Sequence, residues 1–186
     1  MKRLGVFSTI PVIISFLTFS PTPAHPGQEK TDVALKDIEP FTYACVPYQG
    51  PYTEIGKVIG MLMQAMKNQN LFPLMGPMIG VYYNSPEEVE PEELSWEIGF
   101  PVTPQVMPLA PLEKKQWGYT AVAVRIHVGS YETTVHTINK ILEWLKANGY
   151  IVDGPIMERY LDADPSKIKP EELRTEVWVP CKKSEN

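Results

Sequence analysis

The second half of the chain changes its hydrophobic period from two residues to three or four. In 120–128, apolar side chains stand at every second position: Val122, Val124, Ile126 and Val128. This alternation predicts a strand with one apolar face, and Gly129 ends it. Apolar side chains then recur three and four residues apart, which predicts an amphipathic helix. They are Val135, Ile138, Ile141, Leu142 and Leu145.

The first half of the chain follows the same plan. Its strand ends in Gly50-Pro-Tyr52, as the strand of the second half ends in Gly129-Ser-Tyr131. The helix stripe of the first half consists of Ile55, Val58, Ile59, Leu62, Met63 and Met66. Two further strands are expected in each half, at 77–83 and 95–102 and then at 155–161 and 173–181.

Short motifs recur in the same order about 79 residues apart. Gly76-Pro77 matches Gly154-Pro155, and Pro91-Glu-Glu-Leu94 returns letter for letter as Pro170-Glu-Glu-Leu173. We conclude that residues 41–102 and 120–181 are copies of one βαββ unit, joined by a connection over 103–119. Pro-Glu-Glu-Leu predicts a short acidic loop or a single helical turn. The expected fold is α+β, with a mixed, mainly antiparallel sheet and two helices on one side.

The N-terminus reads as an export signal. Lys2 and Arg3 precede an apolar run to Phe19, and Thr22-Pro-Ala24 supplies a cleavage site after Ala24. We therefore expect a signal peptide over 1–24, a polar tether over 25–40 and a periplasmic or secreted domain over 41–186. The alternative is an uncleaved membrane anchor, which the short apolar run disfavours.

The expected cleavage changes the net charge, and the expected compartment bears on the state of the two cysteines. Two of the 17 basic residues lie in the signal, so cleavage changes the net charge from −5 to −7. No basic stripe remains, which makes nucleic acid and anionic membranes poor partners. Cys45 and Cys181 are the only cysteines. In an oxidising compartment they are a candidate disulfide, and the alternative is two buried thiols.

Several residues of the second half carry a family resemblance. The run Gly154-Pro-Ile-Met-Glu-Arg-Tyr160, followed by Asp162-Ala-Asp-Pro165 and Pro170-Glu-Glu-Leu-Arg174, resembles the C-terminal signature of the GyrI-like family. That family is also known as the effector-binding domain of bacterial transcription activators. Val81-Tyr-Tyr-Asn-Ser-Pro86 resembles its mid-domain segment. The resemblance covers roughly 41–181.

The resemblance implies two βαββ modules around a pseudo-twofold axis, with a small-molecule cleft between them. It also implies a buried acidic residue among aromatic rings, which here is Glu158 of Glu158-Arg-Tyr160. Some members of the family are drug sensors fused to DNA-binding domains, one type inhibits DNA gyrase, and some hydrolyse cyclopropane-containing natural products. We expect this chain to depart from the regulators, because the sequence predicts an export signal and shows no recognisable DNA-binding segment.

Comparison of the two copies singles out Glu158. Period two places Glu158 and Tyr160 on one face of their strand. In the first copy Gly80 matches Glu158, and Tyr82 matches Tyr160. The fold therefore does not require a carboxylate here, which points to a ligand-binding or acid–base role. The alternative is a Glu158 that is solvated or paired with Arg125 or Arg174.

Aromatic side chains lie in or beside most of the expected strands, which favours a pocket with aromatic walls. The expected ligand-binding residues are Glu158, Tyr160, Tyr82, Trp96 and Trp117. Glu97 and Glu176 occur in both copies and are expected to serve the fold. The histidines lack metal-ligand spacing, and we expect no metal or other cofactor.

Three functions fit this sequence. The first is an exported small-molecule-binding protein for lipophilic or cationic ligands, of the multidrug-binding kind. The second is a hydrolase of reactive electrophiles, with Glu158 and Tyr160 as its catalytic pair. The third is a protein-interaction module that uses the same groove.

Overall fold

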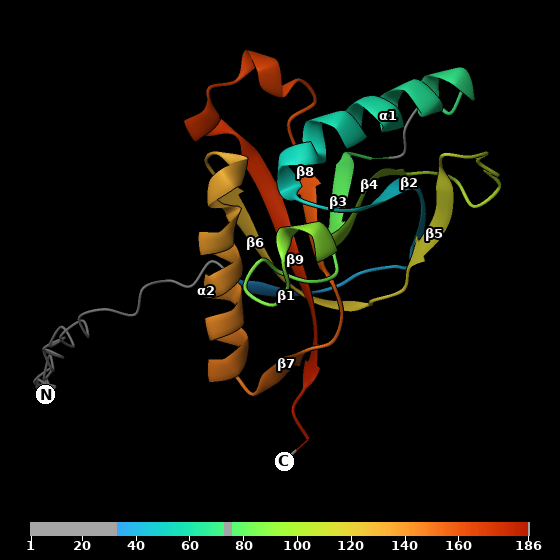
Figure 1. Ribbon diagram of the computed structural model, residues 1–186. Helices are drawn as coiled ribbons and strands as arrows, with labels where there is room; N and C mark the ends of the chain where they lie inside the picture. Colours follow the sequence, from blue (N-terminus) through green and yellow to red (C-terminus); the bar gives the residue numbers. More distant parts are fainter. Residues whose placement is uncertain (1–32, 73–75, 186) are drawn as a thin grey trace, which may run out of the picture. The chain divides into compact units, whose positions relative to one another are not determined.

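The computed structural model describes residues 33–72 and 76–185. The expected signal peptide over 1–24, and its cleavage site, lie outside these residues. The described chain forms α-helices α1 (Ile55–Asn68) and α2 (Thr134–Ala147) and nine strands (Figure 1). The strands are β1 (Ala34–Asp37), β2 (Phe41–Gln49), β3 (Met78–Tyr82), β4 (Ser95–Pro101), β5 (Glu113–Trp117), β6 (Ala121–Val128), β7 (Tyr150–Val152), β8 (Ile156–Tyr160) and β9 (Arg174–Lys183).

The strands form one antiparallel sheet in the order β1-β6-β9-β8-β3-β4-β2-β5, and β7 pairs with the end of β9. The two copies meet where β3 pairs with β8, and Gly80 lies opposite Glu158 in that register. These two positions match in the duplication, so a pseudo-twofold axis passes between them. The Pro-Glu-Glu-Leu segments form single 3₁₀ turns, Pro91–Glu93 and Pro170–Glu172, as expected.

Both helices cover the same face of the sheet, as the sequence predicts. Ile98, Gly80, Glu158 and Val177 form one row across β4, β3, β8 and β9, so their side chains share a face. Ile98 packs in the core beneath α1, and Val177 packs in the core beneath α2. Glu158 therefore lies at the centre of the sheet on its helical face. Figure 1 shows α1 beside β2 and β4, and α2 beside β6 and β9.

The repeat is longer than the motifs indicate. The tether expected over 25–40 contains β1, and the connection expected over 103–119 contains β5. These strands also match at an offset of 79 residues. β1 pairs with β6 of the second copy, and β5 pairs with β2 of the first copy. Each half thus gives its first strand to the other half. The expectation of a plain tether was wrong for Ala34–Asp37, because four residues of weak pattern gain their stability from pairing with β6.

The candidate disulfide is not formed, and both thiols are free and buried. Cys45 packs on the face opposite the helices, whereas Cys181 packs against the α2 side. Four strand-to-strand steps separate β2 from β9, a distance of about 19 Å at about 4.8 Å for each step. A disulfide requires Cα atoms within about 7 Å. Sequence alone does not reveal that the two strands are so far apart.

Candidate functional site

Glu158 lies in a chain of hydroxyl groups at the centre of the sheet. Its side chain is buried, with the residue 6% exposed. The Tyr160 hydroxyl donates to Glu158 Oε2 at 3.0 Å, and the Tyr82 and Tyr160 oxygens are 2.7 Å apart. A hydroxyl has only one proton to donate. If Tyr160 donates its proton to an ionised Glu158, Tyr82 must therefore be the donor in the hydrogen bond between the two tyrosines. Burial raises the pKa of both tyrosines far above the usual value, so both stay protonated and able to donate.

Two further tyrosines complete the cluster in a symmetric way. The Tyr52 ring meets the Tyr82 ring edge-on with centroids 5.4 Å apart, and Tyr131 meets Tyr160 edge-on at 5.2 Å. Burial and the nearby Glu158 raise the pKa of Tyr52 to about 12. Both residues lie in the 3₁₀ turns that lead into the helices. We call Glu158, Tyr52, Tyr82, Tyr131 and Tyr160 the central cluster.

Sequence reasoning missed Tyr52 and Tyr131 as site residues. In each copy the sequence pattern identified Gly-x-Tyr only as the end of a strand. On a pseudo-twofold axis, however, a repeated side chain reaches the same site from both sides. Tyr52 follows Gly50 by two residues, and Tyr131 follows Gly129 by two residues. This equal spacing is the signal that could have identified them.

Gly80 determines how closely the two tyrosines pack. A Cβ atom at this position would lie 2.8 Å from the Tyr82 hydroxyl and 2.9 Å from the Tyr160 hydroxyl. Both are shorter than real Cβ contacts. The space that Glu158 fills in one copy is therefore taken in the other copy by the hydroxyls that bind Glu158.

Glu158 lacks the cationic partners that other buried glutamates have. Glu97 pairs with Lys115, and Glu176 pairs with Lys36 at 2.8 Å and with Arg159. Among the described residues, no Lys, Arg or His nitrogen lies within 4.0 Å of a Glu158 carboxylate oxygen. The expected alternative partner Arg174 binds Asp162 at 2.8 Å instead.

Burial raises the pKa of Glu158, and the hydrogen bond from the Tyr160 hydroxyl only partly opposes the rise. Thr134 begins α2, and its hydroxyl donates to the Tyr131 carbonyl oxygen at 2.9 Å. Its single proton is therefore already used, and the oxygen remains free to accept from a protonated Glu158. The carboxyl group is thus suited to exist in either protonation state.

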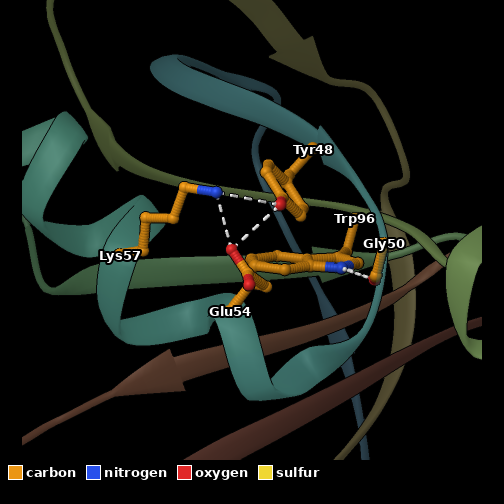
Figure 2. A network of polar contacts seen from close by, with 5 residues as sticks. All are labelled: Tyr48, Gly50, Glu54, Lys57 and Trp96. Atoms are coloured by element: carbon orange, nitrogen blue, oxygen red, sulfur yellow. Dashed lines mark hydrogen bonds and ion pairs between the residues drawn. The ribbon is translucent and has the colours of Figure 1, made fainter.

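Trp96 packs against the central cluster through Tyr52. Its Nε1 donates to the Gly50 carbonyl oxygen at 2.8 Å, and its ring meets the Tyr52 ring with centroids 6.0 Å apart. Figure 2 shows the hydrogen bond from Trp96 to Gly50 beside a network in which Lys57 and Tyr48 both bind Glu54. Trp96 therefore positions the turn that carries Tyr52.

Trp117 does not join the central cluster. It packs on the opposite face of the sheet with Tyr119 and Trp178. The strand that carries it, β5, lies at the sheet edge beside β2. Sequence reasoning placed it in the site because its face could not be assigned without knowledge of that pairing.

The comparisons with known proteins agree with this fold. The model of the GyrI-like small molecule binding domain matches residues 31–182. This chain belongs to the GyrI-like family. Members of the family share a small-molecule-binding domain, so this chain has a role in binding small molecules.

A DNA gyrase inhibitor of Erwinia billingiae (strain Eb661) is 33% identical over 118 residues, which cover 60% of this chain and 74% of that protein. The DNA complex of EcmrR has a TM-score of 0.72 at 19% identity, over 81% of this chain and 57% of that one. This chain thus spans less than two thirds of EcmrR. SAV2435 bound to tetraphenylphosphonium has a TM-score of 0.55 at 15% identity, and the match covers 81% of this chain and 93% of that one. These structures share the fold with this chain.

Within residues 33–72 and 76–185, no helix is long and apolar enough to cross a membrane. No three His, Cys, Asp or Glu side chains in the same residues are grouped in a way that could hold a metal ion.

Proposed function

We propose that the central cluster binds a lipophilic organic cation, with Glu158 as its counterion. The observation that carries this proposal is a buried carboxylate with no cationic partner among the described residues, while Glu97 and Glu176 both have one. An unpaired buried charge is costly, and a bound cation would offset that cost.

The aromatic rings supply the second half of the recognition. Tyr52 and Tyr131 are only partly buried, and Tyr131 is 36% exposed, so these two rings lie nearest to solvent. We propose that they move apart when the ligand enters. A cation without N–H groups would then meet the faces of the four rings, which attract positive charge. The neutral hydroxyls hold the carboxylate in place beneath it.

The tetraphenylphosphonium complex of SAV2435 supports this class of ligand, because the two proteins share the fold. Gyrase inhibition is not carried over from the Erwinia relative, because we also propose that this chain is exported. The basis for export is the basic start, apolar run and Thr22-Pro-Ala24 site of the sequence. Mass spectrometry of the chain from a periplasmic fraction would test this. A mature N-terminus at His25 is expected, and an intact Met1 in the cytoplasm would contradict it.

Calorimetry with tetraphenylphosphonium and with neutral triphenylphosphine oxide tests the proposed ligand class. The wild-type chain should bind the cation, and Glu158→Gln should weaken that binding at least tenfold while changing the affinity for the neutral compound little. Glu171→Gln is the matched control, since Glu171 is exposed in the Pro-Glu-Glu-Leu turn. Equal affinity of wild type and Glu158→Gln for the cation would contradict the proposal.

Hydrolysis of an electrophile is the second candidate function. The raised pKa of Glu158 and its hydrogen bond from Tyr160 fit an acid–base role for this carboxyl group. Turnover of a cyclopropane-bearing substrate, lost in Glu158→Gln, would establish it. Binding of that substrate without turnover in the wild type would leave ligand binding as the function.

A further inference from the structure

Four buried positions at the start of α2 and on the strands beneath it differ in polarity between the two copies. The second copy has polar side chains there, namely His127, Thr134, Thr137 and Thr175. The matching positions of the first copy hold aromatic or aliphatic side chains, namely Tyr48, Ile55, Val58 and Trp96. The fold therefore does not require these polar side chains, and the second copy has a polar region that the first copy lacks.

Three of the four polar side chains have partners within the protein. The Nδ1 atom of His127 lies 2.9 Å from the Thr137 hydroxyl oxygen, and the Thr134 hydroxyl donates to the Tyr131 carbonyl oxygen at 2.9 Å. Thr175 is the exception, because it is 0% exposed and its hydroxyl has no hydrogen-bond partner among the described residues. A buried hydroxyl without a partner is unfavourable, so a ligand that supplied one would gain affinity.

Thr175 lies on the same face of the sheet as Glu158. It is directly opposite Tyr160 in the β8–β9 register, and Glu158 precedes Tyr160 by two residues. Thr175 and Glu158 are thus diagonal neighbours, with Cα atoms about 7–8 Å apart. Two other buried polar atoms lack a partner among the described residues, Nε1 of Trp117 and of Trp178, and both belong to the opposite face. Thr175 therefore adjoins the central cluster, whereas those two atoms do not.

Trp96 takes the place of Thr175 in the first copy and holds the Tyr52 turn. Its Nε1 donates to the Gly50 carbonyl oxygen at 2.8 Å, and its ring centroid lies 6.0 Å from that of Tyr52. The Tyr52 hydroxyl also donates to the Asn84 carbonyl oxygen at 3.1 Å. In the second copy a threonine replaces the indole, and the Tyr131 hydroxyl forms no hydrogen bond with the described part of the chain. Tyr131 is therefore held less firmly than Tyr52, and the α2 side of the cluster is the easier side to open.

We infer that Thr175 is a specificity-determining residue, whose hydroxyl binds a hydroxyl group on one arm of the cationic ligand. This inference rests on the proposed function, in which Glu158 is the counterion. An aryl arm of the ligand enters on the α2 side when Tyr131 moves, and the hydroxyl at its far end meets Thr175. The diagonal spacing of Glu158 and Thr175 leaves room for one aryl ring between the cationic centre and that hydroxyl. A ligand hydroxyl can both donate to and accept from a threonine hydroxyl.

Calorimetry of the whole chain with two related cations tests this inference. The probes are the para-hydroxymethyl and para-methyl derivatives of tetraphenylphosphonium, which differ by one hydroxyl group. The wild type should bind the hydroxymethyl cation about fivefold more tightly, which is the effect of one hydrogen bond. Thr175→Val should remove this preference and change the affinity for the methyl cation little. Thr175→Ser should keep the preference, because it keeps the hydroxyl.

Thr120→Val is the matched control, because Thr120 is exposed in the segment between β5 and β6, and it should keep the wild-type preference. Urea unfolding checks that Thr175→Val is folded, and it should be at least as stable as the wild type since the lost hydroxyl has no partner. Equal affinity of the wild type for both cations, or a preference that persists in Thr175→Val, would overturn the inference and leave the role of Glu158 intact. Failure of the wild type to bind either cation would overturn the proposed function as well.

Discussion

Gly80→Ala tests the packing at the pseudo-twofold axis. The new Cβ would lie 2.8 Å from the Tyr82 hydroxyl and 2.9 Å from the Tyr160 hydroxyl, so both hydroxyls must move. This movement breaks the 2.7 Å contact between the tyrosines and the 3.0 Å bond from Tyr160 to Glu158. We expect losses of about 1 kcal/mol for the neutral bond and about 2 kcal/mol for the bond to the carboxylate.

One effect opposes these losses. Alanine restricts the unfolded chain more than glycine does, which stabilises a protein by about 0.4–1 kcal/mol where the backbone permits it. The backbone of Gly80 is not in the left-handed region, so the restriction applies here. The expected net change is a decrease of about 2–3 kcal/mol in the free energy of unfolding.

Urea unfolding followed by tryptophan fluorescence measures this change. Gly60→Ala is the matched control, because Gly60 lies within α1 and a Cβ there would have no heavy atom within 4 Å. That variant should be more stable than the wild type by about 0.5–1 kcal/mol. If Gly80→Ala were as stable as the wild type while Gly60→Ala behaved as expected, the packing argument would be refuted.

Three further predictions concern the buried charges and thiols. Lys115→Met should lower the free energy of unfolding in urea by about 2–3 kcal/mol, because buried Glu97 loses its cation. Lys36→Met should lower it by under about 1 kcal/mol, since Glu176 keeps its pair with Arg159. Equal losses in the two variants would contradict these ion-pair assignments. The raised pKa of Glu158 means that the folded state holds its proton more tightly, so its contribution is present below about pH 4 and is lost as pH rises through the folded pKa. The stability of the wild type relative to Glu158→Gln should therefore fall from pH 4 upward, and a constant difference would exclude the raised pKa. Unfolded, unreduced protein should give two reactive thiols in a thiol titration, and none would indicate a disulfide.

The sequence predicted the fold well because its signals are local and repeated. The change of period at Gly129 marks a strand and a helix, and the repeated Pro-Glu-Glu-Leu sets the spacing of the two copies. β1 and β5 were missed for the opposite reason. Each is short and has many polar residues, and each gains its order from pairing with a strand of the other copy.

The central cluster was predicted only in part. Glu158, Tyr160 and Tyr82 were expected to lie together, and hydrogen bonds join them; the clue was that Glu158 matches a glycine in the other copy. Trp117 was expected beside them and lies on the opposite face, because the sheet face of an edge strand depends on its pairing. The ion pairs of Glu97 and Glu176 were also invisible, as their lysines lie in the two exchanged strands.

The pH dependence of tetraphenylphosphonium binding tests most directly the claim that Glu158 is the counterion of the ligand. Calorimetry from about pH 4 to pH 8 should show an affinity that rises as Glu158 loses its proton and then stays constant. Glu158→Gln should bind weakly at every pH in this range. An affinity that is independent of pH, and equal in the two proteins, would contradict the account.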